Sequence, residues 1–146
     1  QIGGYERLRR RLEGLVDDDY YPHRLGTTDS ELMFYLLFSE GLETDPILAL
    51  QRSVGRINQE RDALGVDAPF RLTATLTDGA RIYAIRYSTD ETPPSLYWCR
   101  TSTHLMVVSE PLDDDVVDRC WHEIPANQLL VVERSGQIDM VPFIPE

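Results

Sequence analysis

The spacing of apolar side chains predicts three helices in the first half of the chain. Leucines recur every three or four positions across residues 5–15, with arginines mostly between them, which is typical of an amphipathic helix with a basic outer face. Residues 28–38 end in a nearly continuous apolar run, so we expect that helix to be buried on more than one side. The third helix begins at Asp45-Pro46, a cap followed by a proline in the first turn, and ends at Gly65.

The second helix has a well-defined start. Thr28, Asp29, Ser30 and Glu31 have the order of a capping box, in which the first residue caps the helix and the fourth reaches back to it. We therefore expect Thr28 to be the cap and Glu31 to have a structural role. Gly41 is a natural stop for this helix.

The period of the apolar positions changes to two in the second half of the chain, which predicts strands. Asp78-Gly79 is a strong hairpin signal between the first two of them. We expect three antiparallel pairs, at residues 70–76 with 81–87, 96–99 with 105–108, and 129–133 with 138–143. Three helices followed by an antiparallel meander of about six strands give an α+β fold class, and no linker divides residues 1–146.

The charge balance argues against two classes of partner. The net charge is −11, and all of the basic residues are arginine. Such a chain repels phosphate backbones and anionic membranes, so we expect no nucleic-acid and no membrane partner. The longest apolar run, residues 32–38, is too short to span a bilayer, and no signal peptide opens the chain, which predicts a cytoplasmic location. The sequence leaves the oligomeric state open, a homo-oligomer included.

The two cysteines, Cys99 and Cys120, are too few for a disulfide scaffold and lack zinc-ligand spacing. Cys120 and His122 would share one face of a strand, but no orienting group or oxyanion hole is evident for a Cys–His pair. We expect both cysteines to be buried and inert. The histidines and the acidic runs at residues 17–19 and 113–115 show no metal-ligand pattern, so we expect no metal and no cofactor.

Several short segments, spread in order over nearly the whole chain, together carry a resemblance to a known family. The opening segment is Gln1-Ile2-Gly3-Gly4-Tyr5-Glu6-Arg7-Leu8, and the second is Gly26-Thr27-Thr28-Asp29-Ser30-Glu31 before an apolar helix. Shorter matches follow at residues 76–79, 87–88, 108–112, 124–125 and 129–132. Together these segments resemble the single-domain class-II glutamine amidotransferases of bacteria, which use an N-terminal nucleophile.

The resemblance implies a four-layer αββα sandwich, of which residues 1–146 would be the C-terminal portion of one domain. The family nucleophile is a cysteine at the mature N-terminus, whereas residue 1 is Gln here. The substrate-binding arginine and the Asn-Gly pair of the oxyanion hole also lie upstream in the family. We therefore expect no catalytic residue in this chain, a fragment that is inactive alone, and the missing N-terminal half of the domain as a partner.

Asp29 is the residue that the resemblance assigns to the α-ammonium of glutamine or of a γ-glutamyl small molecule. A buried ammonium needs a fixed carboxylate, and the first turn of a helix keeps a carboxylate ionised. The alternative is that Asp29 is only a favourable acid at a helix start. Thr28 and Ser30, with Thr27, would line the same site through hydroxyl or backbone groups.

Two functions of different classes remain open from the sequence. The first is an amidotransferase-like enzyme that releases ammonia from glutamine, or hydrolyses a γ-glutamyl amide, through a cysteine thioester. The second is a non-catalytic ligand-binding or interaction module that retains the fold. A cysteine at the mature N-terminus of the full gene product would distinguish the enzyme from the module.

Overall fold

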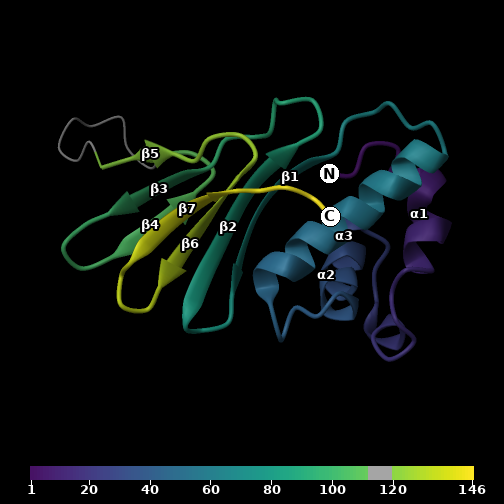
Figure 1. Cartoon of the computed structure of the whole chain (residues 1–146), viewed down its shortest axis with the longest axis horizontal. Coiled ribbons are helices and arrows are strands. Elements are labelled where there is room, and N and C mark those ends of the chain that lie inside the picture. The colour runs from purple at the N-terminus through teal and green to yellow at the C-terminus, as the bar shows by residue number, and fades with distance from the viewer. Residues whose placement is uncertain (112–119) are drawn as a thin grey trace. The chain divides into compact units, whose positions relative to one another are not determined.

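The computed structural model describes residues 1–111 and 120–146, and the chain divides into two units (Figure 1). Gln1–Phe70 and Ile144–Glu146 form the first, which we call the helical unit. Arg71–Phe143 forms the second, which we call the strand unit. The predicted order of helices followed by antiparallel strands is confirmed, and the chain has a mixed α+β architecture.

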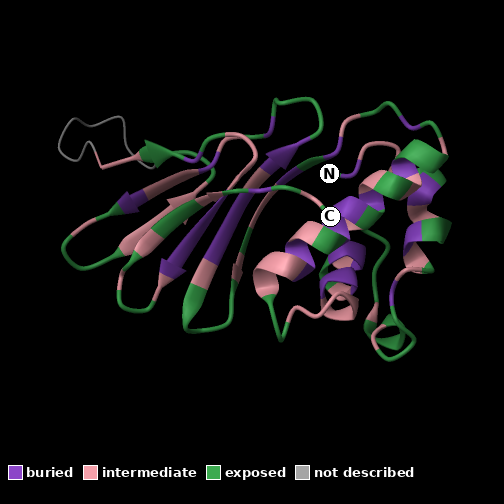
Figure 2. Ribbon diagram, viewed as in Figure 1, coloured by how far each residue is buried: buried purple, intermediate pink, exposed green. Residues whose placement is uncertain are grey.

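The helical unit contains α1 (Tyr5–Glu13), the 3-10 turn η1 (Tyr21–His23), α2 (Asp29–Ser39) and α3 (Pro46–Ala63). Each of the three α-helices contacts the other two. Figure 2 shows their buried positions as stripes along each helix. The apolar periodicity explains these stripes, because the same positions supply the core side chains Leu8, Leu12, Leu32, Leu36, Leu50, Val54 and Ile57, all at most 1% exposed.

The burial of α2 extends beyond a single stripe, as predicted. Leu32 and Leu36 are buried, and so are Met33 and Leu37 beside them. The opposite face of α2 is partly accessible to solvent, as the 44% exposure of Phe34 shows. The unbroken apolar run therefore overstates how much of this helix is covered.

Both ends of the chain are held within the helical unit. Ile2 forms an isolated antiparallel bridge with Phe70 and is 2% exposed. Glu146 donates its backbone N–H to the carbonyl of Gln51 on α3 at 3.2 Å. Gly55 is required beneath this segment, because a Cβ atom there would lie 1.6 Å from the Glu146 carbonyl oxygen.

The strand unit contains two antiparallel sheets. One sheet has the order β1-β2-β6-β7 and the other has the order β4-β3-β5. The strand bounds are β1 (Arg71–Thr77), β2 (Arg81–Ser88), β3 (Tyr97–Arg100), β4 (Leu105–Val108), β5 (His122–Glu123), β6 (Gln128–Glu133) and β7 (Ile138–Pro142). Side chains from both sheets share one core cluster that contains Ala84, Leu96, Ile124, Leu130 and Val132.

The three predicted hairpin pairs are confirmed, but the prediction of a single meander is wrong. β6 pairs with β2, so the strands divide between two sheets. The sequence also gave no indication of β5, which has only two residues. β2 and β6 are the central strands and bury consecutive residues, Tyr83–Ile85 and Leu129–Val132, on both faces. This non-local pairing depends on tertiary packing and not on local turn chemistry.

The expectation of free cysteines is corrected by the structure. Cys99 is fully buried and forms a disulfide with Cys120, which closes a sequence separation of 21 residues. The His122 ring stacks instead on Trp98, with ring centroids 4.6 Å apart. The Cys120–His122 pair therefore has no free thiol. Disulfides are rare in cytosolic proteins, so this one does not support the predicted cytoplasmic location. That location stays a prediction.

Candidate functional site

The three residues predicted to line the substrate site lie together at the start of α2. Thr28 and Ser30 are exposed and Asp29 is half-buried, so this helix end lies outside the packed core. The Oγ1 atom of Thr28 accepts a hydrogen bond from the Glu31 N–H at 3.2 Å, which confirms Thr28 as the N-cap. Because Thr28 caps the helix, the Asp29 carboxylate is available for other contacts.

The carboxylate of Asp29 binds two backbone N–H groups. Oδ2 accepts a hydrogen bond from Ile2 N–H at 2.7 Å, and Oδ1 accepts one from Ser30 N–H at 2.9 Å. The Ser30 hydroxyl lies 3.4 Å from Oδ1. Asp29 thus fixes the N-terminal segment to the helix start, a role the sequence did not indicate. A carboxylate has about four acceptor positions, so these contacts leave capacity for an ammonium donor.

Glu31 shapes the turn before α2, but differently from the prediction. Its Oε1 accepts the Leu25 N–H at 2.8 Å and its Oε2 accepts the Gly26 N–H at 2.8 Å, whereas the capping box predicted a return to Thr28. These backbone hydrogen bonds lower the pKa of the Glu31 carboxyl. A Cβ atom on residue 26 would lie 2.9 Å from Oε2, so the close approach of Glu31 favours glycine there.

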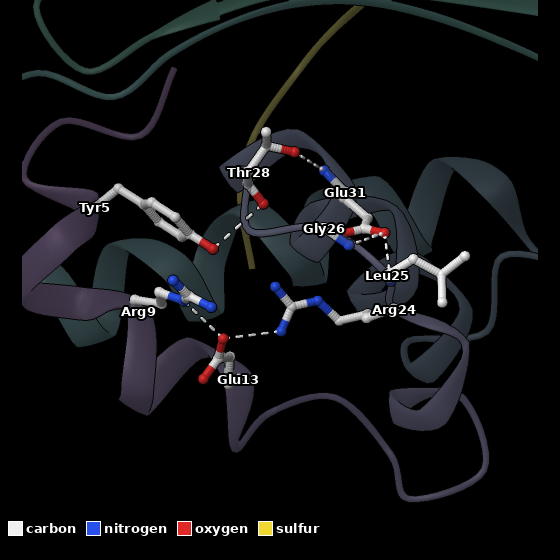
Figure 3. Close-up of polar contacts among 8 residues, drawn as sticks. All are labelled: Tyr5, Arg9, Glu13, Arg24, Leu25, Gly26, Thr28 and Glu31. Carbon is white, nitrogen blue, oxygen red and sulfur yellow. Dashed lines mark hydrogen bonds and ion pairs between the residues drawn. The ribbon is translucent and has the colours of Figure 1, made fainter.

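A cluster of charged residues, missed by the sequence analysis, lies beside this turn (Figure 3). Glu13 Oε1 accepts hydrogen bonds from Arg9 Nε at 2.8 Å and from Arg24 Nη1 at 3.0 Å. The hydrogen bond from Arg9, together with that from Arg24, lowers the pKa of the Glu13 carboxyl against the effect of burial. The Tyr5 hydroxyl donates to the Thr28 carbonyl at 3.3 Å, and burial raises the pKa of Tyr5. We call Tyr5, Arg9, Glu13 and Arg24 the arginine cluster.

One sequence feature pointed to this cluster. Arg24 is the one residue with a permanent charge between positions 20 and 28. The partners of Arg24 come from α1, so only the tertiary structure brings the cluster together.

Other chemistry is limited in the part of the chain that the structure describes. Residues 1–111 and 120–146 hold no group of three or more His, Cys, Asp or Glu side chains that could bind a metal ion. Residues 17–19 lie in this described part, and the second acidic run, residues 113–115, lies outside it. No helix within the same ranges is long and apolar enough to cross a membrane.

The geometry of the chain has a counterpart among solved structures. The chain is similar to a class-II glutamine aminotransferase domain protein from Silicibacter pomeroyi. The two share 38% sequence identity with a TM-score of 0.91, over 100% of this chain and 65% of that protein. This similarity supports a class-II glutamine amidotransferase-like family for the chain. The chain spans about two thirds of the length of that protein.

Two further comparisons gave no match. No protein-family model matches this sequence. No curated protein matches it either.

Proposed function

We propose that this chain is the part of a class-II glutamine amidotransferase that recognises the α-ammonium of its substrate. The observation that supports this most directly is the start of α2. There Thr28 performs the capping, and the half-buried Asp29 carboxylate is held by two N–H donors with acceptor positions to spare. The substrate class is glutamine or a γ-glutamyl small molecule.

The geometry favours an ammonium ligand on physical grounds. The backbone donors of Ile2 and Ser30 fix both carboxylate oxygens of Asp29, so ligand binding needs little further ordering of this side chain. The first turn of a helix stabilises a negative charge, so the position of Asp29 suits a carboxylate. A hydrogen bond between an ammonium and a carboxylate is roughly twice as strong as a neutral one.

We assign the remaining parts of the proposed reaction to groups other than those of residues 1–146. A thiol would attack the γ-carbonyl carbon of glutamine, ammonia would leave as the thioester forms, and water would then release glutamate. The cysteine, the oxyanion donors and the carboxylate-binding arginine would come from a preceding segment that completes a four-layer αββα sandwich. Residues 1–146 alone are expected to be inactive.

The test is turnover in a full-length protein that contains this chain. Asp29→Ala should reduce glutamine-dependent ammonia release at low glutamine by roughly 100-fold, as expected when a charge-assisted contact is lost. Asp45→Ala is a matched control, because Asp45 also accepts two backbone N–H groups at a helix start. It should change turnover by less than about threefold.

Three outcomes are distinguishable in this experiment. Loss with Asp29→Ala alone supports the proposal. Unchanged turnover in Asp29→Ala removes Asp29 from the site. Glutamine binding without any ammonia release in the unsubstituted protein supports the ligand-binding module instead.

A further inference from the structure

Arg24 is a buried cation whose hydrogen-bonding groups are only partly used. Its side chain is 5% exposed, and its Nη1 donates to Glu13 at 3.0 Å. Its Nε and Nη2 atoms are buried and have no hydrogen-bond partner among the described residues. Buried polar groups are nearly always paired, and an unpaired donor on a charged group is destabilising, so these two atoms require an explanation.

The two unpaired atoms form one edge of the guanidinium group. The N–H bonds of Nε and Nη2 on that edge are nearly parallel, and their spacing matches the two oxygens of a carboxylate. A spherical anion such as chloride cannot engage both donors with the same geometry. The unused edge therefore suits a group that presents two oxygen atoms side by side, as a carboxylate does.

Charges of both signs surround this edge. Within the arginine cluster, Arg9 and Arg24 share a single carboxylate, that of Glu13. Two other carboxylates lie near the turn, but each binds backbone donors: Glu31 binds Leu25 and Gly26, and Asp29 binds Ile2 and Ser30. Figure 3 shows the Arg24 guanidinium between Glu13 on one side and the turn at Gly26 and Thr28 on the other.

We propose that the free edge of Arg24, with Arg9 and the Tyr5 hydroxyl beside it, binds the carboxylate group of a small molecule. Two neighbouring side chains are partly exposed. Arg9 is 42% exposed, and the Tyr21 ring, whose centroid lies 5.8 Å from the Arg24 guanidinium carbon, is 45% exposed. Because the edge itself is buried, binding requires a change of rotamer in one of these residues. This site does not use Asp29, so it stands independently of the proposed function.

The experiment is a titration of the 146-residue chain followed by ¹H–¹⁵N NMR of arginine Nε–H groups and of the Leu25 and Gly26 amides. The probes are acetate and glutarate, with chloride at matched ionic strength and with inorganic phosphate. We expect a saturable shift of the Arg24 Nε–H signal and of both amides with either carboxylate. Chloride should give only a small linear shift.

Three variants identify the groups involved. Arg24→Lys keeps the charge but lacks the two-donor edge, so the saturable response of the amides should disappear. Arg9→Gln should weaken binding by roughly threefold, because one of two adjacent positive charges is lost. Arg10→Gln is the matched control, since Arg10 is exposed on the same helix, and its affinity should not change.

The proposal is overturned by any of four results. These are no saturable shift with either carboxylate, an equal response to chloride, saturation by phosphate alone, or full affinity in Arg24→Lys. If Arg24→Lys fails to fold, the difference between Arg9→Gln and Arg10→Gln decides the question. Acetate and glutarate carry no ammonium group and cannot use the site proposed at Asp29, which separates this test from that of the proposed function.

Discussion

The two units of the chain use different kinds of contact to join residues that are far apart in the sequence. The strand unit uses a disulfide between Cys99 and Cys120, 21 residues apart. The helical unit uses a hydrogen bond from the Ile2 N–H to the Asp29 carboxylate, 27 residues apart, at 2.7 Å. The covalent connection removes both thiols from chemistry, whereas the hydrogen-bonded one leaves a charged group with unused acceptor positions. Among the residues that the structure describes, the charged groups that we propose for ligand binding therefore lie in the helical unit.

The starts of α2 and α3 sharpen this difference. At α3, Asp45 caps its own helix by accepting the N–H groups of Ile47 and Leu48, both at 3.1 Å. At α2, Thr28 takes the capping role, and Asp29 instead reaches across the unit. Capping thus accounts for Asp45 but does not account for Asp29.

The largest expected effect is loss of the disulfide. Replacing both cysteines, as Cys99→Ser with Cys120→Ser, should lower the free energy of unfolding by about 3 kcal/mol, because the unfolded chain is no longer cross-linked. Urea denaturation of the oxidised chain and of the double variant measures the difference. Equal midpoints for the two proteins would show that the covalent connection does not restrain the strand unit.

A smaller effect is expected at the hydrogen-bonded connection. Asp29→Ala leaves the N–H of the buried Ile2 without an acceptor and should lower the free energy of unfolding by about 1–3 kcal/mol. Asp45→Ala should lower it by about 1 kcal/mol, the usual effect of removing a helix cap. Thermal unfolding of both variants provides the comparison. A neutral Asp29→Ala would mean that Asp29 does not hold the N-terminal segment.

The smallest effect concerns the turn that presents Asp29. Backbone hydrogen bonds from Leu25 and Gly26 place the pKa of Glu31 below its ordinary value of 4.5. The ionised Glu31 carboxylate therefore stabilises the folded chain fully above pH 4.5. This contribution is lost as the pH falls through the lowered pKa of Glu31 in the folded state. Glu31→Gln should remove this dependence on pH. NMR chemical shifts of the Leu25 and Gly26 amides, recorded during an acid titration, measure the effect. The prediction is contradicted if these two amides titrate in the same way in Glu31→Gln and in the unsubstituted chain.

Local signals in the sequence were sufficient for most of the fold. Asp45-Pro46 and Thr28 each identified a helix start, because caps act on residues within three positions. Asp78-Gly79 identified the β1–β2 hairpin for the same reason. The pairing of β2 with β6 was not predicted, since the alternation of side chains sets the faces of a strand but not its distant neighbour.

The start of α2 was predictable from the sequence, but the contacts of the residues beside it were not. The order of residues 28–31 located the helix start, whereas the contacts of Asp29 with Ile2 and of Arg24 with Glu13 depend on how α1 packs against α2. The two cysteines gave no indication of their pairing, because two thiols 21 residues apart meet only in the folded strand unit. Long-range hydrogen bonds and disulfides follow from tertiary structure, which local patterns do not encode.

The central claim is that the Asp29 carboxylate binds the α-ammonium of the substrate. Isothermal titration calorimetry of a full-length protein should compare L-glutamine with the analogue that lacks only the α-amino group. Glutamine should bind roughly 10- to 100-fold more tightly to the unsubstituted protein, and Asp29→Asn should reduce this preference to nearly onefold. A preference that survives in Asp29→Asn would contradict the claim.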